Sequence, residues 1–192
     1  MLKRFLFCCI VLGSASIARA QDPWDIAKTT IAGKKVQIEY GRPLLKGRAL
    51  AELMKQLPPD RVWRAGSGPL TVLSTETDLA IGGKKVPAGD YSLYMHCPEN
   101  GDFALIINRD IGAPSNGPLE KAMSDRSNRA YPHFMDYTMA IADKEVARIP
   151  LKQIKSSKSE VLVYSFDPAG DGALLTISWG GQAWTVEFQP VR

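Results

Sequence analysis

Short runs of alternating apolar and polar residues, separated by tight-turn sequences, most limit how this chain can fold. From residue 70 to the C-terminus such runs recur, and turn formers divide them at Gly82-Gly83, Pro87-Ala88-Gly89 and Gly180-Gly181. A side-chain period of two is typical of a strand with one buried face, and these turns join antiparallel neighbours. We therefore predict a mainly β fold, an antiparallel β-sandwich of jelly-roll-like type, with a barrel as the alternative.

The individual strands follow from the same pattern. In residues 35–40, for example, Val36, Ile38 and Tyr40 are predicted to face the core because they alternate with polar residues. The predicted strands are residues 26–32, 35–40, 70–75, 79–81, 84–86, 90–97, 103–108, 133–142, 145–151, 161–166, 173–179 and 183–188.

One short amphipathic helix is predicted, over residues 49–57. Its apolar side chains recur at helical spacing, at Leu50, Leu53, Met54 and Leu57. Pro58 and Pro59 then end the helix, because proline cannot continue it. Two other segments are predicted to be irregular. Residues 109–132 form a long excursion, with one turn of helix around 119–123, of a kind that is often functional. Residues 152–158, rich in Lys and Ser, are predicted to be a solvated loop.

The first twenty residues have the pattern of a secretory signal peptide. Lys3 and Arg4 precede a short apolar run, and Ala18-Arg19-Ala20 has the small-x-small pattern of a cleavage site. The apolar run is too short for a membrane span. We therefore expect cleavage after Ala20, one β-sandwich domain over residues 21–192, and a periplasmic or extracellular location with no membrane span after cleavage.

Cleavage would also change the charge of the protein and its cysteine content. Loss of Lys3, Arg4 and Arg19 would lower the formal net charge from +4 to +1, which argues against a nucleic-acid partner. Cys8 and Cys9 would leave with the signal peptide, so that only Cys97 remains and no intramolecular disulfide can form.

A cluster of cationic residues forms the candidate ligand site. Arg42, Lys46 and Arg48 lie within seven residues beside Pro43 and Gly47, and Trp63-Arg64 follows the predicted helix. Guanidinium groups match carboxylate or phosphate bidentately, and a tryptophan ring offers a face for stacking. We predict that these five residues bind a small anionic or carbohydrate-like ligand: Arg42, Lys46, Arg48, Trp63 and Arg64. The alternative is that Arg42 and Arg64 pair with carboxylates such as Glu39 or Glu52, while Lys46 and Arg48 are solvated.

The sequence contains no familiar catalytic motif and no convincing metal site. There is no G-x-S-x-G, S-x-x-K, H-E-x-x-H or Walker sequence, so no catalytic residue is assigned and no cofactor is expected. Met95-His96-Cys97 and His133-Phe134-Met135 have ligand types that suit copper, but alternation along a strand would place His96 opposite Met95 and Cys97. Residues 167–172 superficially suggest calcium and are predicted to form a hairpin turn.

Several blocks, in order, resemble a known family. They are residues 38–43, 46–48, 62–66, 82–93 and 106–108, which include Ile-Glu-Tyr-Gly-Arg-Pro and Val-Trp-Arg-Ala-Gly. The chain resembles the bacterial secreted family called Domain of Unknown Function 2911. That resemblance implies an exported, mainly β protein without an assigned activity. Members usually carry Asn-Glu after the Trp-Arg block, where this chain has Gly68-Pro69, so a carboxylate and an amide are absent there.

Three functional hypotheses follow. The first is a non-catalytic binding module that uses the cationic cluster. The second is a hydrolase-like enzyme that uses His133 with Asp125 or Asp136. The third is an envelope structural or assembly protein in which an exposed sheet edge pairs with a partner strand. The sequence favours the first and leaves the oligomeric state open.

Overall fold

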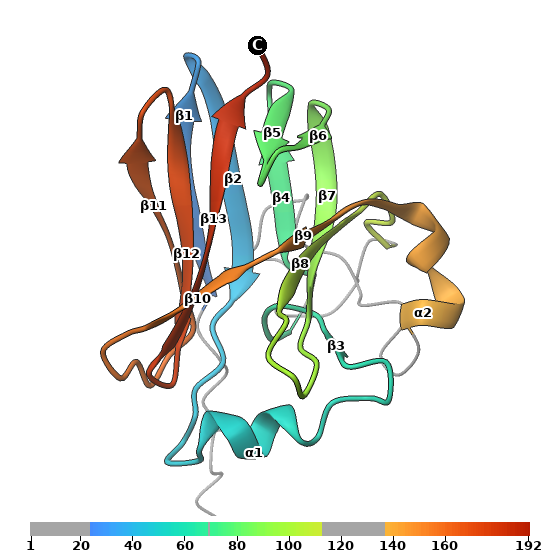
Figure 1. The fold of residues 1–192 in the computed structure, drawn as a ribbon, viewed down its shortest axis with the longest axis vertical. Helices are drawn as coiled ribbons and strands as arrows, with labels where there is room; N and C mark the ends of the chain where they lie inside the picture. Colours follow the sequence, from blue (N-terminus) through green and yellow to red (C-terminus); the bar gives the residue numbers. More distant parts are fainter. Residues whose placement is uncertain (1–23, 69, 113–136) are drawn as a thin grey trace, which may run out of the picture.

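The chain folds into two antiparallel β-sheets that pack face to face, as the computed structural model of residues 24–68, 70–112 and 137–192 shows (Figure 1). One sheet has the order β1-β2-β4-β7-β8-β9, with β3 paired to β7, and the other has the order β11-β12-β13-β5-β6, with β10 paired to β13. The strands are β1 (Trp24–Ile31), β2 (Lys34–Gly41), β3 (Val62–Trp63), β4 (Val72–Thr75), β5 (Leu79–Ile81), β6 (Lys84–Val86), β7 (Gly89–His96), β8 (Ala104–Asn108), β9 (Glu145–Pro150), β10 (Lys152–Lys155), β11 (Val163–Ala169), β12 (Gly172–Trp179) and β13 (Gln182–Pro190). The predicted β-sandwich is confirmed.

Alternation along the strands creates the core between the sheets. In β12, Ala173, Leu175, Ile177 and Trp179 are buried, while the residues between them are only partly buried. Strand β2 departs from this pattern, because its polar face is buried as well: Glu39 is 1% exposed, and it accepts a hydrogen bond of 2.8 Å from Gln37 Nε2. The prediction of a single buried face was therefore wrong for β2.

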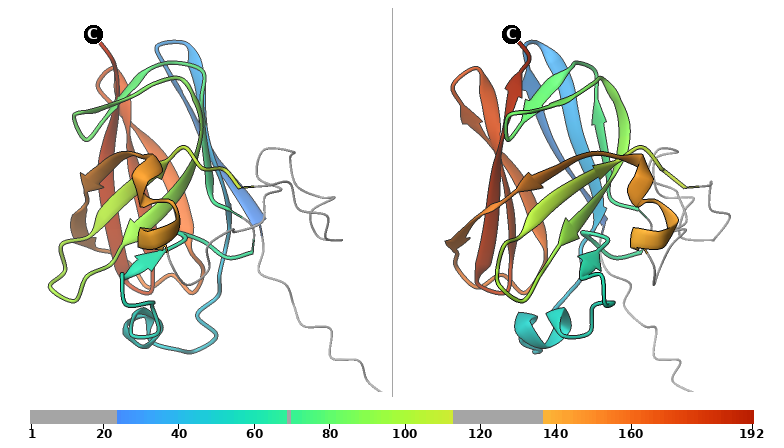
Figure 2. Two further views of the ribbon diagram at one scale, coloured as in Figure 1. Left: turned by 90° about the vertical axis from the view of Figure 1, so that its right-hand side faces the viewer. Right: turned by 45° about the vertical axis from the view of Figure 1, so that its right-hand side comes forward.

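The predicted helix is shorter than its apolar pattern suggested. Helix α1 spans Leu50–Met54, and the chain continues in tighter turns in which Gln56 N–H bonds to the Leu53 carbonyl and Leu57 N–H to the Met54 carbonyl. The two prolines at 58 and 59 explain this, because a residue that precedes proline disfavours the α conformation. Helix α1 lies across one end of the sandwich (Figures 1 and 2).

The strand predicted over residues 133–142 is wrong in its described part. Residues 137–140 form α2 (Tyr137–Ala140), and a 3-10 turn, η2 (Ala142–Lys144), follows. Tyr137 and Ile141 are buried and lie four residues apart, which is one helical face, whereas Met139 between them is 83% exposed. Asp60 accepts a hydrogen bond of 3.2 Å from the Thr138 N–H at the start of this helix.

The basic segment after β9 is also more regular than predicted. Residues 152–155 form β10, which pairs with the first four residues of β13, and all four of its side chains are exposed. Backbone pairing alone therefore makes this segment a strand, and no alternation of buried and exposed side chains indicates it in the sequence. The predicted turn between β11 and β12 is present at Gly170-Asp171. Among the described residues, no helix is long and apolar enough to cross a membrane.

Candidate functional site

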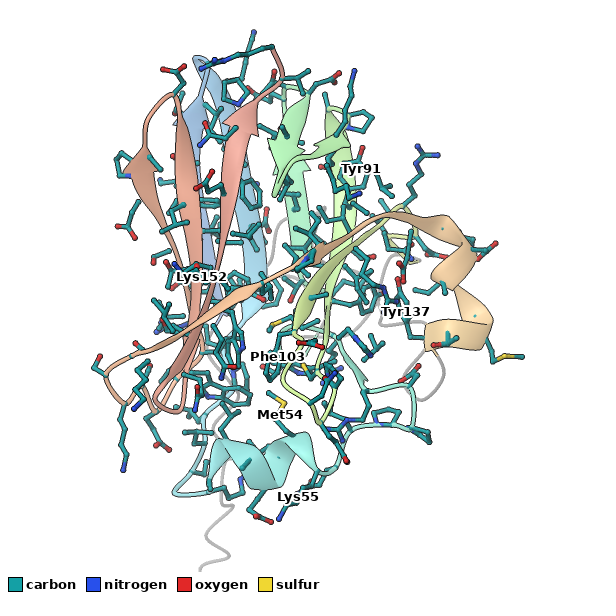
Figure 3. All side chains as sticks on the ribbon, in the orientation of Figure 1. Met54, Lys55, Tyr91, Phe103, Tyr137 and Lys152 are labelled. Carbon is teal, nitrogen blue, oxygen red and sulfur yellow. The ribbon has the colours of Figure 1, made fainter. Side chains whose placement is uncertain are left out.

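A pocket of about 300 Å³ lies under α1 at the end of the sandwich. Its volume is at the lower end of the range of small-molecule sites. Apolar side chains from α1 and the following turn, Leu53, Met54 and Leu57, form one wall. Met54 projects from the side of α1 that faces the sheets, whereas Lys55 lies on the other side (Figure 3). The rest of the lining comes from Pro43, Leu44, Lys46, Arg48, Gln56, Pro58, Val62, Trp63, Arg64, Gly66, Ser67 and Trp179. We call this the anion pocket, after the ligand class that the sequence predicts for its cationic residues.

Two stacked tryptophans form the aromatic wall of the anion pocket. The rings of Trp63 and Trp179 lie 5.3 Å apart with an angle of 17° between their planes. The short pairing of β3 with β7 positions Trp63, and Trp179 is the last residue of β12. Trp179 is 5% exposed, and its indole Nε1 has no hydrogen-bond partner among the described residues. Ser67 Oγ, which also lines the pocket, is likewise buried without a hydrogen-bond partner among the described residues.

Three cationic side chains from the predicted cluster line this pocket: Lys46, Arg48 and Arg64. Arg48 is held by its own loop, since Nε donates to the Leu45 carbonyl at 2.8 Å. Arg64 Nη1 donates to the Gly68 carbonyl at 3.0 Å. Lys46 makes no hydrogen bond or ion pair with any residue that the structure describes. Two arginines held by backbone carbonyls and one lysine therefore surround an apolar pocket.

The predicted fifth member, Arg42, does not line the anion pocket. Its Nε donates to the Leu162 carbonyl at 3.3 Å, and its guanidinium lies 3.5 Å from the Asp25 carboxylate. Arg42, which follows β2, thus links that strand to β1 and to the segment before β11. The alternative that Arg42 pairs with a carboxylate is confirmed, although its partner is Asp25 and not one of the two examples given, Glu39 and Glu52. Sequence proximity to Lys46 and Arg48 did not determine which way this side chain points.

Buried tyrosines fix the segment that carries Trp63 and Arg64. The carbonyl of Ala65 accepts hydrogen bonds from Tyr164 Oη at 2.7 Å and from Thr71 Oγ1 at 3.2 Å. The backbone N–H of Tyr164 in turn donates to Tyr40 Oη at 3.0 Å. Burial raises the pKa of Tyr164 well above its ordinary value, so this phenol stays protonated and remains a donor. Ala65 also has a left-handed backbone, with φ of 53°, that these bonds hold in place.

The loop that carries Lys46 and Arg48 is bonded to the segment between β10 and β11. Leu45 N–H donates to the Glu160 carbonyl at 2.9 Å, and Gly47 N–H donates to the Glu160 carboxylate at 3.2 Å. Lys46 and Gly47 both have positive φ, 54° and 74°, which makes the tight turn that returns the chain towards α1. The cations are therefore placed by an ordered loop.

Of the two copper candidates, Met95-His96-Cys97 lacks the necessary geometry, and His133-Phe134-Met135 lies outside the described residues. Met95 and Cys97 are buried in the core, whereas His96 is on the opposite face of β7 and half-buried. The described residues contain no group of three or more His, Cys, Asp or Glu side chains that could hold a metal ion. His133, Asp125 and Asp136, which the hydrolase hypothesis used, lie outside the described residues, as does most of the excursion over residues 109–132.

Cys97 is predicted to be chemically inert in the folded protein. Burial raises the pKa of its thiol to about 12, so the reactive thiolate is scarce at neutral or mildly alkaline pH. In the chain that begins at Gln21, in which Cys97 is the sole thiol, a disulfide reagent such as Ellman's reagent should react at pH 8 only after denaturant is added. A thiol that reacted at once without denaturant would contradict its burial.

Sequence reasoning missed the residues that complete the pocket from elsewhere in the chain. Trp179 was predicted only as part of a strand, and Ser67 was not singled out at all. The Gly180-Gly181 turn after Trp179 was a signal that this tryptophan lies at an end of the sandwich, but nothing in the sequence indicated which loop it faces.

Comparison with known proteins gives one finding. Searches of curated proteins and of solved structures returned no match to this chain. The profile of a family described as "Protein of unknown function (DUF2911)" matches residues 22–188, which is most of the sequence. The match includes both the loop that carries Lys46 and Arg48 and the segment that carries Trp63 and Arg64. The chain therefore belongs to the DUF2911 family.

Proposed function

We propose that the protein is a non-catalytic binding module for a small organic anion that has a flat apolar body. The observation that carries the proposal is the convergence of Lys46, Arg48 and Arg64 on an apolar pocket with a stacked tryptophan wall. Cations around an apolar cleft favour a carboxylate or phosphate on an apolar molecule, because each part of the ligand then has a matching surface.

Two further polar atoms support this assignment. Trp179 Nε1 and Ser67 Oγ are buried on the lining and have no partner among the described residues. A buried donor without an acceptor costs about 1–3 kcal/mol, so a ligand oxygen that pairs with either one gains that energy. A purely hydrocarbon ligand would leave both atoms without a hydrogen bond and would not gain this energy.

The test is a thermal-shift comparison of matched ligands. Phenyl phosphate and indole-3-acetate should raise the melting temperature, whereas phenol and indole-3-acetamide, which lack the anionic group, should not at the same concentration. At a hundred times its Kd a ligand stabilises the native state by about 2.7 kcal/mol, which is about 5–11 °C in a domain of this size. Equal shifts by the neutral and anionic members of each pair would overturn the proposal.

We also propose that the protein is exported, to the periplasm or outside the cell. The support is the cationic start, the short apolar run and the Ala18-Arg19-Ala20 pattern. Mass spectrometry of the extracytoplasmic fraction should find a chain that begins at Gln21, in part cyclised to pyroglutamate. Recovery of the uncleaved chain in the membrane fraction would show that the segment is an anchor instead.

A further inference from the structure

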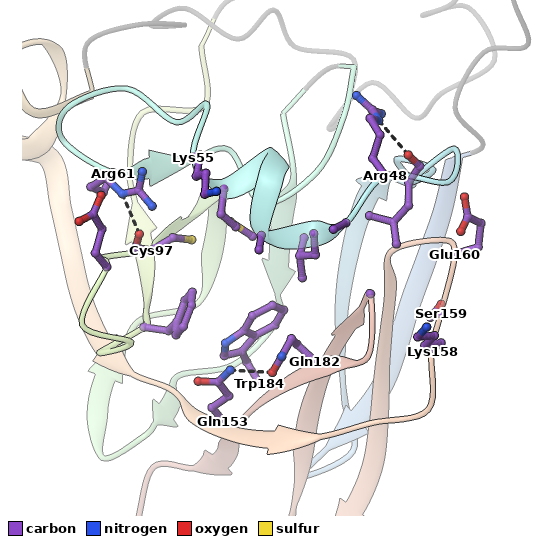
Figure 4. A pocket seen from close by; sticks show the side chains of 18 of the residues that line it. Arg48, Lys55, Arg61, Cys97, Gln153, Lys158, Ser159, Glu160, Gln182 and Trp184 are labelled. Atoms are coloured by element: carbon purple, nitrogen blue, oxygen red, sulfur yellow. Dashed lines mark hydrogen bonds between the residues drawn. The ribbon is translucent and has the colours of Figure 1, made fainter.

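A second and larger cavity, of about 970 Å³, also lies between α1 and the strands (Figure 4). It shares only Arg48 and Met54 with the anion pocket. Helix α1 forms its roof, and β10 and β13 contribute its floor. None of the cationic candidates other than Arg48 lines it, so this cavity is a site of its own. We call it the floor cavity.

The β10–β13 ladder supplies a group of hydrogen-bonding side chains to the floor cavity. Gln153 stands opposite Trp184 in the pairing of these strands, and Gln182 is two residues from Trp184, so the residues on β13 share one face. Gln153 Nε2 donates to Gln182 Oε1 at 2.7 Å. This bond leaves Gln153 Oε1 as an acceptor and Gln182 Nε2 as a donor, neither of them with a partner among the described residues.

Trp184 adds an aromatic surface and a third polar atom. It is 1% exposed, and its indole Nε1 has no hydrogen-bond partner among the described residues. Its ring lies 5.1 Å from that of Phe103 with an angle of 52° between the planes. Phe103 is only half-buried, so an aromatic face borders the two amides and the indole N–H.

We propose that the floor cavity binds an oligosaccharide, with acidic sugars preferred. A sugar ring has an apolar C–H face, which fits an aromatic side chain, and hydroxyls that both donate and accept, which fit a mixed set of amide and indole groups. A hydrocarbon chain would fill the apolar part of the cavity but would bury these polar groups without hydrogen bonds, which costs binding free energy. The polar groups therefore favour the sugar.

The charges at the rim of the floor cavity set the preference for acidic sugars. Four cations line it, Arg48, Lys55, Arg61 and Lys158, against two carboxylates, Glu99 and Glu160. Lys55 is paired with Glu52, and Arg61 Nε donates to the Cys97 carbonyl, but the excess of positive charge remains. A positive rim attracts an anionic ligand and accelerates its association, and added salt weakens the effect.

Calorimetric titration of the purified protein with cellotetraose, chitotetraose and tetragalacturonate tests the proposal. Tetragalacturonate should bind more tightly than the two neutral tetrasaccharides, and the difference should narrow in high salt. Gln153→Ala and Gln182→Ala should each weaken its binding about two- to tenfold, since each removes a neutral hydrogen-bonding group. Both side chains are at least partly exposed, so the variants should fold.

Two control variants assign the result to the floor cavity. Gln56→Ala removes an exposed amide from the anion pocket, and Arg64→Ala removes a cation there; neither should alter tetragalacturonate binding. Absence of binding by all three saccharides at millimolar concentration would overturn the proposal. So would binding that survives both amide substitutions. Loss of saccharide binding in Arg64→Ala alone would place the sugar in the anion pocket. That result would overturn the floor cavity as a second site, but it would not contradict the proposed binding role of the anion pocket.

Discussion

Gly41→Ala should be the most destabilising single-methyl substitution near the site, with a loss of about 3 kcal/mol in the free energy of unfolding. A Cβ on Gly41 would overlap the backbone carbonyl of Ser67, and it would lie 2.9 Å from Ser67 Oγ. Backbone cannot yield as a flexible side chain can, so β2 or the segment around Ser67 must move. The Ser67 N–H, which donates to the Gly41 carbonyl at 3.3 Å, would be disturbed as well.

Urea denaturation of Gly41→Ala beside Gly33→Ala measures this effect. Gly33 has a positive φ of 72° but open space around its missing Cβ, so alanine there should cost only about 1 kcal/mol of backbone strain. The melting temperature of Gly41→Ala should fall by about 6–12 °C. A Gly41→Ala variant no less stable than Gly33→Ala would mean that β2 and Ser67 are not in such close contact.

Most of the β framework could be predicted because its signal is local. Alternation within β12 and the Gly180-Gly181 turn before β13 need no knowledge of the rest of the chain. Strand β10 escaped prediction because its four side chains are exposed, and only its pairing with β13 makes it a strand. The segment with Tyr137, Met139 and Ile141 was predicted as a strand because its apolar residues alternate. The same alternation also places Tyr137 and Ile141 four residues apart, and these are the two that the helical segment buries.

The site was predicted in part, for a related reason. Lys46 and Arg48 come together because a tight turn with positive φ connects them, and that turn is signalled by Gly47. Arg42 lies close in sequence but at the end of β2, where the side chain points to Asp25 on the neighbouring strand. Trp179 comes from the far end of the chain, and long-range packing, which alternation does not encode, places it against Trp63.

Arg64→Ala should abolish most of the affinity for phenyl phosphate. Arg64 lines the anion pocket, and loss of a hydrogen bond to a charged group costs about 1.5–3 kcal/mol, which is about ten- to a hundredfold in Kd. The hydrogen bond from Arg64 to the Gly68 carbonyl, which the substitution also removes, is exposed, so its loss should cost little stability. Arg48→Ala should also weaken binding, with some loss of loop order because Arg48 bonds to the Leu45 carbonyl.

Arg42→Ala is the matched control, since it removes the same charge outside the pocket. Its loss should leave affinity unchanged and should lower stability by about 1 kcal/mol, because it breaks the bond to the Leu162 carbonyl and a partly exposed ion pair with Asp25. In a domain of this size that is about 2–4 °C in melting temperature.

Measurement of affinity and melting temperature in the same two arginine variants tests the binding role most directly. The Kd for phenyl phosphate, from calorimetric titration, should rise at least about tenfold in Arg64→Ala with an almost unchanged melting temperature. In Arg42→Ala the melting temperature should fall while the Kd stays at the wild-type value. Equal affinities in wild type and Arg64→Ala, or an affinity lost in Arg42→Ala and kept in Arg64→Ala, would contradict the assignment of Lys46, Arg48 and Arg64 as an anion site.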